Sequence, residues 1–577
     1  MSAVEELNSG DTSPLKGPAP KALPEDTSDV DKNEDIMPLT SPGDQPVQFV
    51  PGQPSNGDAK VEIGDAGGPP AFVGLGKEEL MKYANDPFWV RLRWFLFILF
   101  WAVWVAMLVG AIIIIVLAPK CAEKKHGTDS FYELNLKNFA KDGKLADLGE
   151  RASYLSDLGV TSVIIADVLK KDEFGGIVDF KNVDDQVGTI TEFSDAMRKL
   201  KNAGLMILMT LVPNHSSTKH EWFVDPEHQF HDYYVRKPEG EVFGSSWVVV
   251  DAKPQQSAWV KDPAHNDTRY LQLFNGTADL NFRNDKVIEE MTGIFAYWKG
   301  KGVDAFVIPA ASYLVEDLSQ LKEQRATMNQ PENIDVVKTI LKRQTNEPSS
   351  FVEVKSLSQE AAAKYLENGI VPLSNEFDIS TILDQYATTA SKMSFFQQVH
   401  KSNHPVIRLS GPAGRLQGQN QDEANILRLL TYTSNASVIL HFGDEVDNFD
   451  PKLNTMDWTQ ATNSGGTFTF LKKLAGIQRS LVDEEGKEGF TYPYKGADVK
   501  VFAFVRSEKY VVIVNFGTSE ADVDFGELLS EPEAKAEVII ATPNAADLTP
   551  KTVLTKKVTL PWRSGVLLEK ITEAAAA

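Results

Sequence analysis

The chain has 577 residues, which is too long for one compact core and predicts several domains. Hydrophobic residues make up 42% of it and charged residues 24%, so a wholly disordered, collagen-like or many-span membrane protein is excluded. The net charge of -22 would repel phosphate backbones, and nucleic-acid binding is therefore not expected. The single cysteine, Cys121, excludes an internal disulfide framework and a cysteine-rich zinc site.

The first 88 residues have the composition of a disordered tail. They hold 12 of the 30 prolines and carry 16 acidic against 6 basic side chains. Apolar residues in this segment do not recur at helical or strand spacing, so it cannot bury enough surface to offset the entropy of folding. Residues 1–88 are therefore predicted to be disordered. They also lack the order of a cleavable signal peptide, and no processing is expected there.

The next segment is predicted to cross a membrane. Residues 94–118 contain no charged side chain, and a helix of this length spans the roughly 30 Å of a hydrocarbon core. Tryptophans cluster toward its start, as they do at membrane interfaces. A buried core helix is the alternative interpretation. We predict one transmembrane signal-anchor helix over residues 89–118 and a juxtamembrane neck over residues 119–129.

The flanking charges favour a cytoplasmic N-terminus only slightly, since four basic residues precede the apolar run and three follow it. The acceptor sequences for N-glycosylation give more information. All of them lie after the apolar run, at Asn214, Asn266, Asn275 and Asn435, which places the bulk of the chain outside the cell. Asn214 is a doubtful acceptor, because it is expected at the end of a buried strand.

Beyond the neck, apolar strand-like runs alternate with helical patterns. The runs are VTSVIIA, LMILMTLV, GVDAFVI, PVIRLS and ASVILHF. This alternation predicts a parallel sheet with crossover helices, and eight such units over residues 130–475 would form a (β/α)8 TIM barrel. From about Gly489 the pattern changes to short alternating strands, which predicts an antiparallel β-sandwich domain over residues 476–577.

Several motifs of the predicted barrel resemble, in the same order, those of the α-amylase and α-glucosidase superfamily of glycoside hydrolases. The stretch from DLGVTSVIIA to LVPNHSS is similar to the first three barrel strands of that family, including Gly188-Thr189 and Asn214-His215. The match continues through the fourth and eighth strands with ADLNFRND, GVDAFVIPA, GDE at 443–445 and MDW at 456–458.

Most residues that carry out hydrolysis in that family are missing. A retaining glycosidase needs two carboxylates about 5 Å apart, one as nucleophile and one as proton donor. By the resemblance, Val307 and Pro309 stand at the positions of the orienting arginine and the nucleophilic aspartate, and Thr210 replaces an aspartate of the third strand. The segment 410–412, Ser-Gly-Pro, replaces the Asn-His-Asp of the seventh strand. Only Glu353 is matched to an acid, and no catalysis is expected.

No metal site and no cofactor are expected either. The oxygen ligands of the family's calcium site cannot be assembled from the matching positions. Asp304 and the pair Asn214-His215 do match the family, and we interpret them as buried hydrogen-bonding partners at strand ends.

A glycosidase-like ectodomain on one signal-anchor helix with one juxtamembrane cysteine resembles the heavy chains of the heteromeric amino-acid transporters. Of the two types in that family, the lone Cys121 favours the four-F-two cell-surface antigen type over the cysteine-rich renal type. The resemblance implies an inactive subunit that brings a polytopic light chain to the plasma membrane and bonds to it through Cys121. It also implies a link to integrin signalling. A helix without an embedded ionisable residue does not line a polar path, which agrees with an accessory role.

Ala102, Ala106 and Gly110 repeat every four residues and so lie on one face of the predicted transmembrane helix. Small side chains let another helix approach closely, which makes this face a candidate contact with the light chain. Alanine and glycine are, however, common in such helices.

Two other functions stay open at this point. The first is a cell-surface α-glucosidase, against which Pro309 argues because proline has no nucleophilic side chain. The second is an adhesion or signalling receptor that has no transporter partner.

Overall fold

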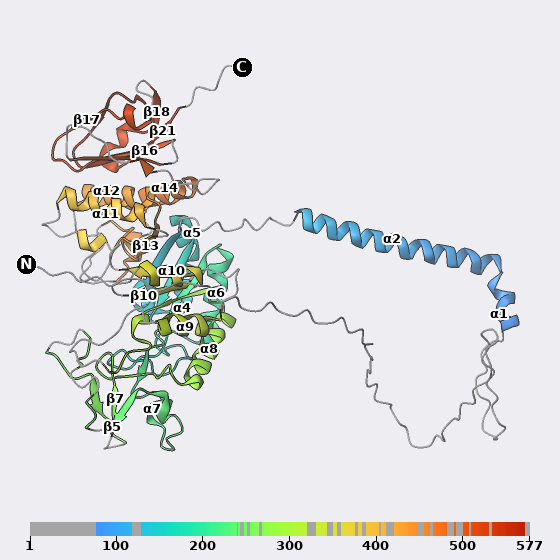
Figure 1. Cartoon of the computed structure of the whole chain (residues 1–577). Coiled ribbons are helices and arrows are strands. Elements are labelled where there is room, and N and C mark those ends of the chain that lie inside the picture. The colour runs from blue at the N-terminus through green and yellow to red at the C-terminus, as the bar shows by residue number, and fades with distance from the viewer. Residues whose placement is uncertain are drawn as a thin grey trace, which may run out of the picture. The chain divides into compact units, whose positions relative to one another are not determined.

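The computed structural model forms two compact units, Met1–Pro119 and Lys120–Ala577 (Figure 1). It describes residues 77–117 and 129–571, except for gaps at 239, 243–246, 251–253, 265–267, 320–330, 343–349, 355–358, 375–378, 383–387, 403–404, 411–419, 448–454, 462–465, 482–489, 492–499, 507–508 and 530–533. Most of the predicted tail, nearly all of the neck with Cys121, and Asn266 lie outside the described residues.

The first unit contains the helices α1 (Lys77–Ala84) and α2 (Pro87–Leu117). Residues 1–88 were predicted to be disordered, and this prediction is wrong for the last part of the segment, where α1 and the start of α2 are helical. Pro87 occupies the first helical position, and the Asp86 carboxylate accepts a hydrogen bond from the amide of Phe88 at 2.9 Å, which together start α2. The segment Pro87–Gly110 has a mean hydropathy of 2.2, so α2 is long and apolar enough to cross a membrane.

The second unit confirms the predicted (β/α)8 barrel. Its eight parallel strands follow the order β11-β10-β9-β3-β2-β1-β13-β12. They are β1 (Ser130–Asn135), β2 (Ser162–Ala166), β3 (Met206–Thr210), β9 (Ala305–Ile308), β10 (Ser350–Val354), β11 (Ile370–Ser374), β12 (Val406–Arg408) and β13 (Ser437–His441). The stretch that we matched to the first three strands holds only the second and third, β2 and β3, because the first strand lies upstream of it.

Helices connect these strands. α6 shows why they form: a capping box of Thr189 and Glu192 starts it, and its apolar residues recur at helical spacing on the buried face. The helices of this unit are α3 (Leu136–Phe139), α4 (Leu145–Glu150), α5 (Ala152–Leu158), α6 (Ile190–Asn202), α7 (Glu221–Val224), α8 (Asp285–Gly300), α9 (Pro331–Leu341), α10 (Gln359–Glu367), α11 (Thr389–Lys401), α12 (Gln421–Thr433), α13 (Trp458–Ala461) and α14 (Gly466–Ser480).

Alternate residues of each barrel strand point inward and outward. The outward residues join the large core that the helices cover. The inward residues form a separate apolar cluster inside the barrel, and all eight strands contribute to it. Its members are Phe131, Ile164, Leu208, Ala305, Val307, Phe351, Leu373, Val406 and Ile439. The barrel interior is thus packed with side chains.

A small β-subdomain is inserted between β3 and α8. It consists of a two-stranded and a three-stranded antiparallel sheet, built from β4 (His215–Ser217), β8 (Thr277–Asp279), β5 (Arg236–Pro238), β7 (Thr268–Leu271) and β6 (Trp259–Lys261). Trp247, Ala258, Trp259 and Leu271 form a core of its own.

The predicted antiparallel β-domain follows α14 and packs on the barrel helices (Figure 1). Its strands are β14 (Phe490–Thr491), β15 (Val501–Arg506), β16 (Tyr510–Asn515), β17 (Ala521–Val523), β18 (Lys535–Ala541), β19 (Thr552–Leu554), β20 (Val558–Leu560) and β21 (Ser564–Lys570). Phe502 and Phe504 belong to the barrel core, whereas Val501 and Val505 belong to the core of the β-domain. The main sheet is therefore buried on both faces. The predicted boundary at residue 475 falls inside α14.

Candidate functional site

Four polar side chains from four strands gather at the mouth of the barrel, where the strands end. Glu133, Glu353, Arg408 and His441 each follow, two residues later on the same strand, a member of the apolar cluster inside the barrel. Since successive side chains alternate between the faces of a strand, these four also point inward. They form the next layer toward the carboxyl ends of the strands, where catalytic residues of such barrels lie.

Arg408 connects the two carboxylates of this mouth cluster. Its Nη2 atom lies 2.7 Å from Oε1 of Glu353 and 3.6 Å from Oε1 of Glu133. The Nδ1 atom of His441 lies 3.6 Å from Oε2 of Glu133. Burial acts to raise the pKa of Glu133, but the contact with His441 and the charge of Arg408 outweigh it and hold that pKa below its usual value. Glu133 is thus kept in its charged form.

The acid of this cluster that is matched to a catalytic position is Glu353, and it pairs with Arg408. A retaining glycosidase also needs a second carboxylate that acts as the nucleophile. On the neighbouring strand β9, Val307 is only 1% exposed and packs in the apolar cluster, and Pro309 follows the strand directly. Thr210 lies opposite Val307 in the register of β3 and β9. The three positions predicted to have lost catalytic groups therefore lie side by side and carry no acid.

Ser410, matched to the catalytic segment of the seventh strand, is buried just beyond β12. Its hydroxyl lies 2.8 Å from Oδ1 and 2.7 Å from Oδ2 of Asp444 and donates its proton to that carboxylate. The rest of that segment, residues 411 and 412, lies outside the described residues. Ser410 thus acts as a hydrogen-bonding partner inside the fold.

Glu445 is a second buried acid near the mouth. Its Oε1 atom accepts hydrogen bonds from the hydroxyls of Tyr132 at 2.6 Å and Tyr154 at 3.0 Å, and its Oε2 atom accepts one from the amide of Gly443 at 3.0 Å. Burial raises the pKa of Glu445 to about 7 in spite of these three donors. The pair Asp444-Glu445 therefore holds the loop after β13 in place.

Asn214 and His215 are buried hydrogen-bonding partners, whereas Asp304, predicted to be buried as well, is half-buried and also pairs with Lys201 at 2.8 Å. Asn214 is fully buried; its Nδ2 donates to the carbonyl of Tyr313 at 2.7 Å, and its Oδ1 lies 3.0 Å from Nδ1 of His215. Asp304 accepts from the amide of Ile207 at 2.9 Å, at the end of β9 away from the mouth. The burial of Asn214 leaves no room for a glycan there.

The predicted glycosylation sites differ in exposure. Asn275 is exposed in a turn before β8, and Asn435 is half-buried between α12 and β13.

On α2, the side chains of Ala102 and Ala106 are exposed within the first unit, and Gly110 is half-buried. Among the described residues, no group of three or more His, Cys, Asp or Glu side chains is placed to hold a metal ion.

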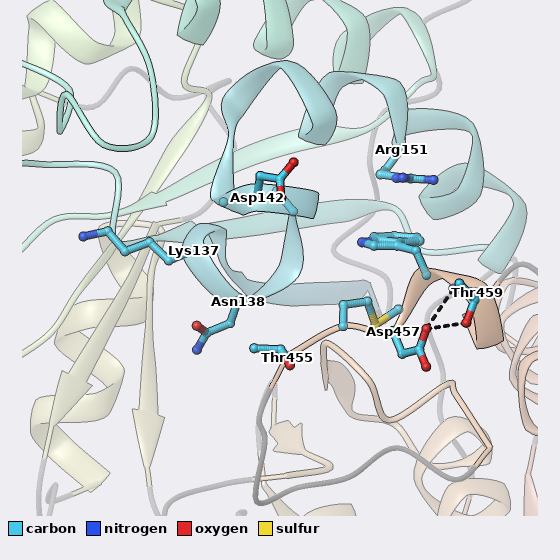
Figure 2. A pocket seen from close by; sticks show the side chains of 11 residues that line it. Lys137, Asn138, Asp142, Arg151, Thr455, Asp457 and Thr459 are labelled. Atoms are coloured by element: carbon cyan, nitrogen blue, oxygen red, sulfur yellow. Dashed lines mark hydrogen bonds between the residues drawn. The ribbon is translucent and has the colours of Figure 1, made fainter.

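A pocket of about 600 Å³ is lined by α3 and the residues that follow it, by Arg151 and by residues 455–459 (Figure 2). The guanidinium of Arg151 stacks 4.0 Å from the ring centre of Trp458 and also pairs with Asp147 at 3.0 Å. Lys137 pairs with Asp184 at 2.8 Å. Both cations of the pocket thus have anionic partners, and the described lining includes no residue of the mouth cluster.

Comparison with known proteins agrees with this fold. Residues 127–474 match the model of the α-amylase catalytic domain. The chain belongs to the α-amylase family. Residues 58–132 match a second model, described as the N-terminus of solute carrier family 3 member 2. This match extends the likeness beyond the α-amylase domain to the segment that contains α2.

The relatives of this α-amylase family member include transporter subunits as well as enzymes. The mouse amino acid transporter heavy chain SLC3A1 is 24% identical over 87% of this chain and 86% of its own length. The rat heavy chain SLC3A2 is 33% identical over 35% of this chain and 40% of its own length. An α-glucosidase of Culex pipiens is 24% identical over 78% and 92%. The resemblance to transporter heavy chains is thereby confirmed.

Among solved structures, trehalose-6-phosphate hydrolase of Bacillus licheniformis superposes with a TM-score of 0.63. The superposition covers 77% of this chain and 99% of the hydrolase at 15% sequence identity. This likeness shows the fold alone.

The sequence analysis identified Glu353 but missed three members of the mouth cluster, Glu133, Arg408 and His441. A signal for two of them was present, because Arg408 and His441 interrupt the apolar runs PVIRLS and ASVILHF near their carboxyl ends. A charged side chain at that place in a barrel strand points toward the mouth.

We predict that Glu445 makes the stability of the ectodomain depend on pH. Its pKa is about 7 in the folded chain and near 4.5 when unperturbed, so the folded state keeps a proton that the unfolded state loses. This contribution to stability is complete below about pH 4.5 and is lost as the pH rises through about 7. Glu445→Gln should flatten the fall of stability with pH by up to about 1.4 kcal/mol per pH unit. Thermal unfolding of the full chain between pH 5 and 8 measures this.

Glu289→Gln, at an exposed position of α8, is the matched control and should leave the pH profile unchanged. Profiles of wild type and Glu445→Gln that run parallel would contradict the prediction.

Proposed function

We propose that the chain is a catalytically inactive heavy-chain subunit that escorts a polytopic amino-acid transporter light chain to the plasma membrane and stabilises it there. The observation that supports this most directly is the mouth cluster, in which Arg408 binds the one acid that is matched to a catalytic position, Glu353. This mouth cluster occurs in a chain whose N-terminal part matches the model of a solute-carrier family. The same resemblance supports a link to integrin signalling.

The anchoring of this subunit rests on α2. In the proposal, α2 crosses the plasma membrane with residues 1–88 in the cytoplasm and the barrel and β-domain outside the cell. The apolar length of α2 and the glycosylation sequences that follow it support this arrangement. Because α2 has no charged residue from Trp94 onward, it contributes a packing surface rather than a path for amino acids.

α2 offers two different faces to a partner in the membrane. Ala102, Ala106 and Gly110 form one row. At about 100° per residue, a second row lies on nearly the opposite side. It consists of the exposed rings of Trp94, Phe97, Trp101 and Trp104, whose neighbouring ring centres lie 5.9, 6.3 and 5.8 Å apart in edge-to-face contacts. We assign the light chain to the row of small residues, because it permits close approach of two backbones.

Cys121 provides the covalent part of the proposed attachment. A lone cysteine just outside the membrane, in an oxidising compartment, is suited to an intermolecular disulfide. The bond would tether two chains that already pack together and so raise their effective concentration.

A cell-surface α-glucosidase is the second candidate, since the Culex pipiens α-glucosidase is matched over 92% of its length. The mouth cluster argues against it. We predict that the purified full chain hydrolyses an aryl α-glucoside no faster than its Glu353→Gln variant, because neither has a nucleophile at position 309. An active α-glucosidase serves as the positive control. Turnover that scales with protein concentration and disappears in Glu353→Gln would establish the enzyme instead.

Cys121→Ser tests the disulfide. We expect the high-mass species on a non-reducing gel to disappear, while a polytopic membrane protein still co-purifies in mild detergent because packing survives. A high-mass species that persists would show that Cys121 is not the link. If no membrane protein co-purifies with wild type, the receptor interpretation replaces the heavy-chain proposal.

The two faces of α2 are best compared in the Cys121→Ser background, where the disulfide cannot mask a loss of packing. Ala106→Leu combined with Gly110→Leu should lower recovery of the partner severalfold in detergent, because the larger side chains keep the helices apart. Phe97→Leu combined with Trp101→Leu changes the opposite face and should have little effect. The reverse result would assign the partner to the aromatic row.

A further inference from the structure

Two aromatic rings are exposed on the ectodomain around one glycosylation sequence. Phe174 is 53% exposed and Phe274 is 37% exposed. Phe174 lies in the loop after β2, and Phe274 directly precedes the acceptor sequence Asn275-Gly276-Thr277, about a hundred residues later. Exposure of such rings to water is unfavourable, so rings retained on both sides of one acceptor sequence suggest a contact that is made in the mature protein.

The ring of Phe174 lies on the acceptor sequence itself. A Cβ atom placed on Gly276 would be 2.5 Å from Cδ2 and 2.6 Å from Cγ of this ring. Gly276 also has a φ of +77°, which L-amino acids with side chains rarely adopt. The middle residue of the acceptor sequence must therefore be glycine, and the Phe174 ring is held next to Asn275.

Hydrogen bonds fix both sides of this contact. The Thr277 hydroxyl donates to the carbonyl of Phe274 at 2.8 Å and accepts from its amide at 3.2 Å, which closes the turn that exposes Asn275. On the other loop, the Asp172 carboxylate accepts from the amides of Phe174 and Gly176, both at 2.9 Å. The ring and the acceptor side chain are thus positioned before any ligand arrives.

We propose that Asn275 carries an N-linked glycan and that its first N-acetylglucosamine packs against the ring of Phe174. In the transfer, Nδ2 of Asn275 forms a bond to the anomeric carbon of a lipid pyrophosphate-linked oligosaccharide. The bond from that carbon to the phosphate oxygen breaks, the pyrophosphate leaves, and the amide gives up one proton. The C–H groups on one face of the sugar then contact the negative face of the aromatic ring.

A sugar fits this surface better than a protein partner does. Two rings offer far less than the ~1,000 Å² that a stable protein interface buries. A glycan attached to Asn275 is covalently held beside Phe174, so a weak contact suffices. The inference rests on the proposed placement of the ectodomain outside the cell.

The test is a double-mutant cycle on full-length protein from eukaryotic cells. Mass spectrometry of the peptide that contains Asn275 should show a glycan. Asn275→Gln should lower the midpoint of thermal unfolding by about 1–3 °C, because the contact between sugar and ring is lost. In the Phe174→Ala background the same substitution should have almost no further effect. Phe174→Leu keeps apolar contact but has no aromatic face, and it should behave like Phe174→Ala, whereas Phe174→Trp should retain the coupling.

Three results would overturn the inference in distinguishable ways. If Asn275 is unmodified while Asn266 or Asn435 carries a glycan, the inference fails and the proposed function stands. If Asn275 is modified but the two substitutions have additive effects, the contact with Phe174 is absent. If none of the three asparagines is modified, the outward placement of the ectodomain fails together with the inference.

Discussion

The ion pair between Arg408 and Glu353 is the constraint on which the interpretation of the barrel depends. Both side chains point into the mouth of the barrel and are partly exposed, Arg408 at 18% and Glu353 at 35%, but each borders the apolar interior and so needs a partner of opposite charge close by. Arg408 meets this need for Glu353 at 2.7 Å and contributes to it for Glu133 at 3.6 Å. This pairing engages the one acid of the cluster that is matched to a catalytic position. The charged side chains at the mouth thereby link strands β1, β10 and β12.

On the same strands, apolar or uncharged side chains occupy positions that are matched to catalytic groups. Val307 belongs to the cluster inside the barrel, to which all eight strands contribute, and its register partner Thr210 is uncharged. An aspartate or an arginine at such positions would have to give up its bound water or bring water into the barrel, whereas valine adds to the apolar packing. In the proposed function, the loss of the catalytic groups and the closer packing of the interior would thus be one and the same change.

The architecture could be predicted from sequence because buried parallel strands are continuous apolar runs, and several of the eight were identified in this way. Two strands were harder to find. β1 carries Glu133 among its apolar residues, and β11 contains Pro372, which usually argues against a central strand. The mouth cluster could not be assembled from sequence, because its four members are spread over 309 positions between Glu133 and His441 and only closure of the barrel brings them together. Helix α1 was missed because it is short and precedes a proline.

Features that can act on other molecules lie on the outside of this protein. The interior of the barrel and the interface of the β-domain with the barrel are closed by packing and by paired charges. By contrast, both faces of α2 and the rings beside Asn275 expose apolar surface, which a folded chain retains at a cost. The barrel and the β-domain share one apolar core and so form a rigid support on which such surfaces can be displayed. In the proposed function, the barrel serves as a scaffold and performs no catalysis.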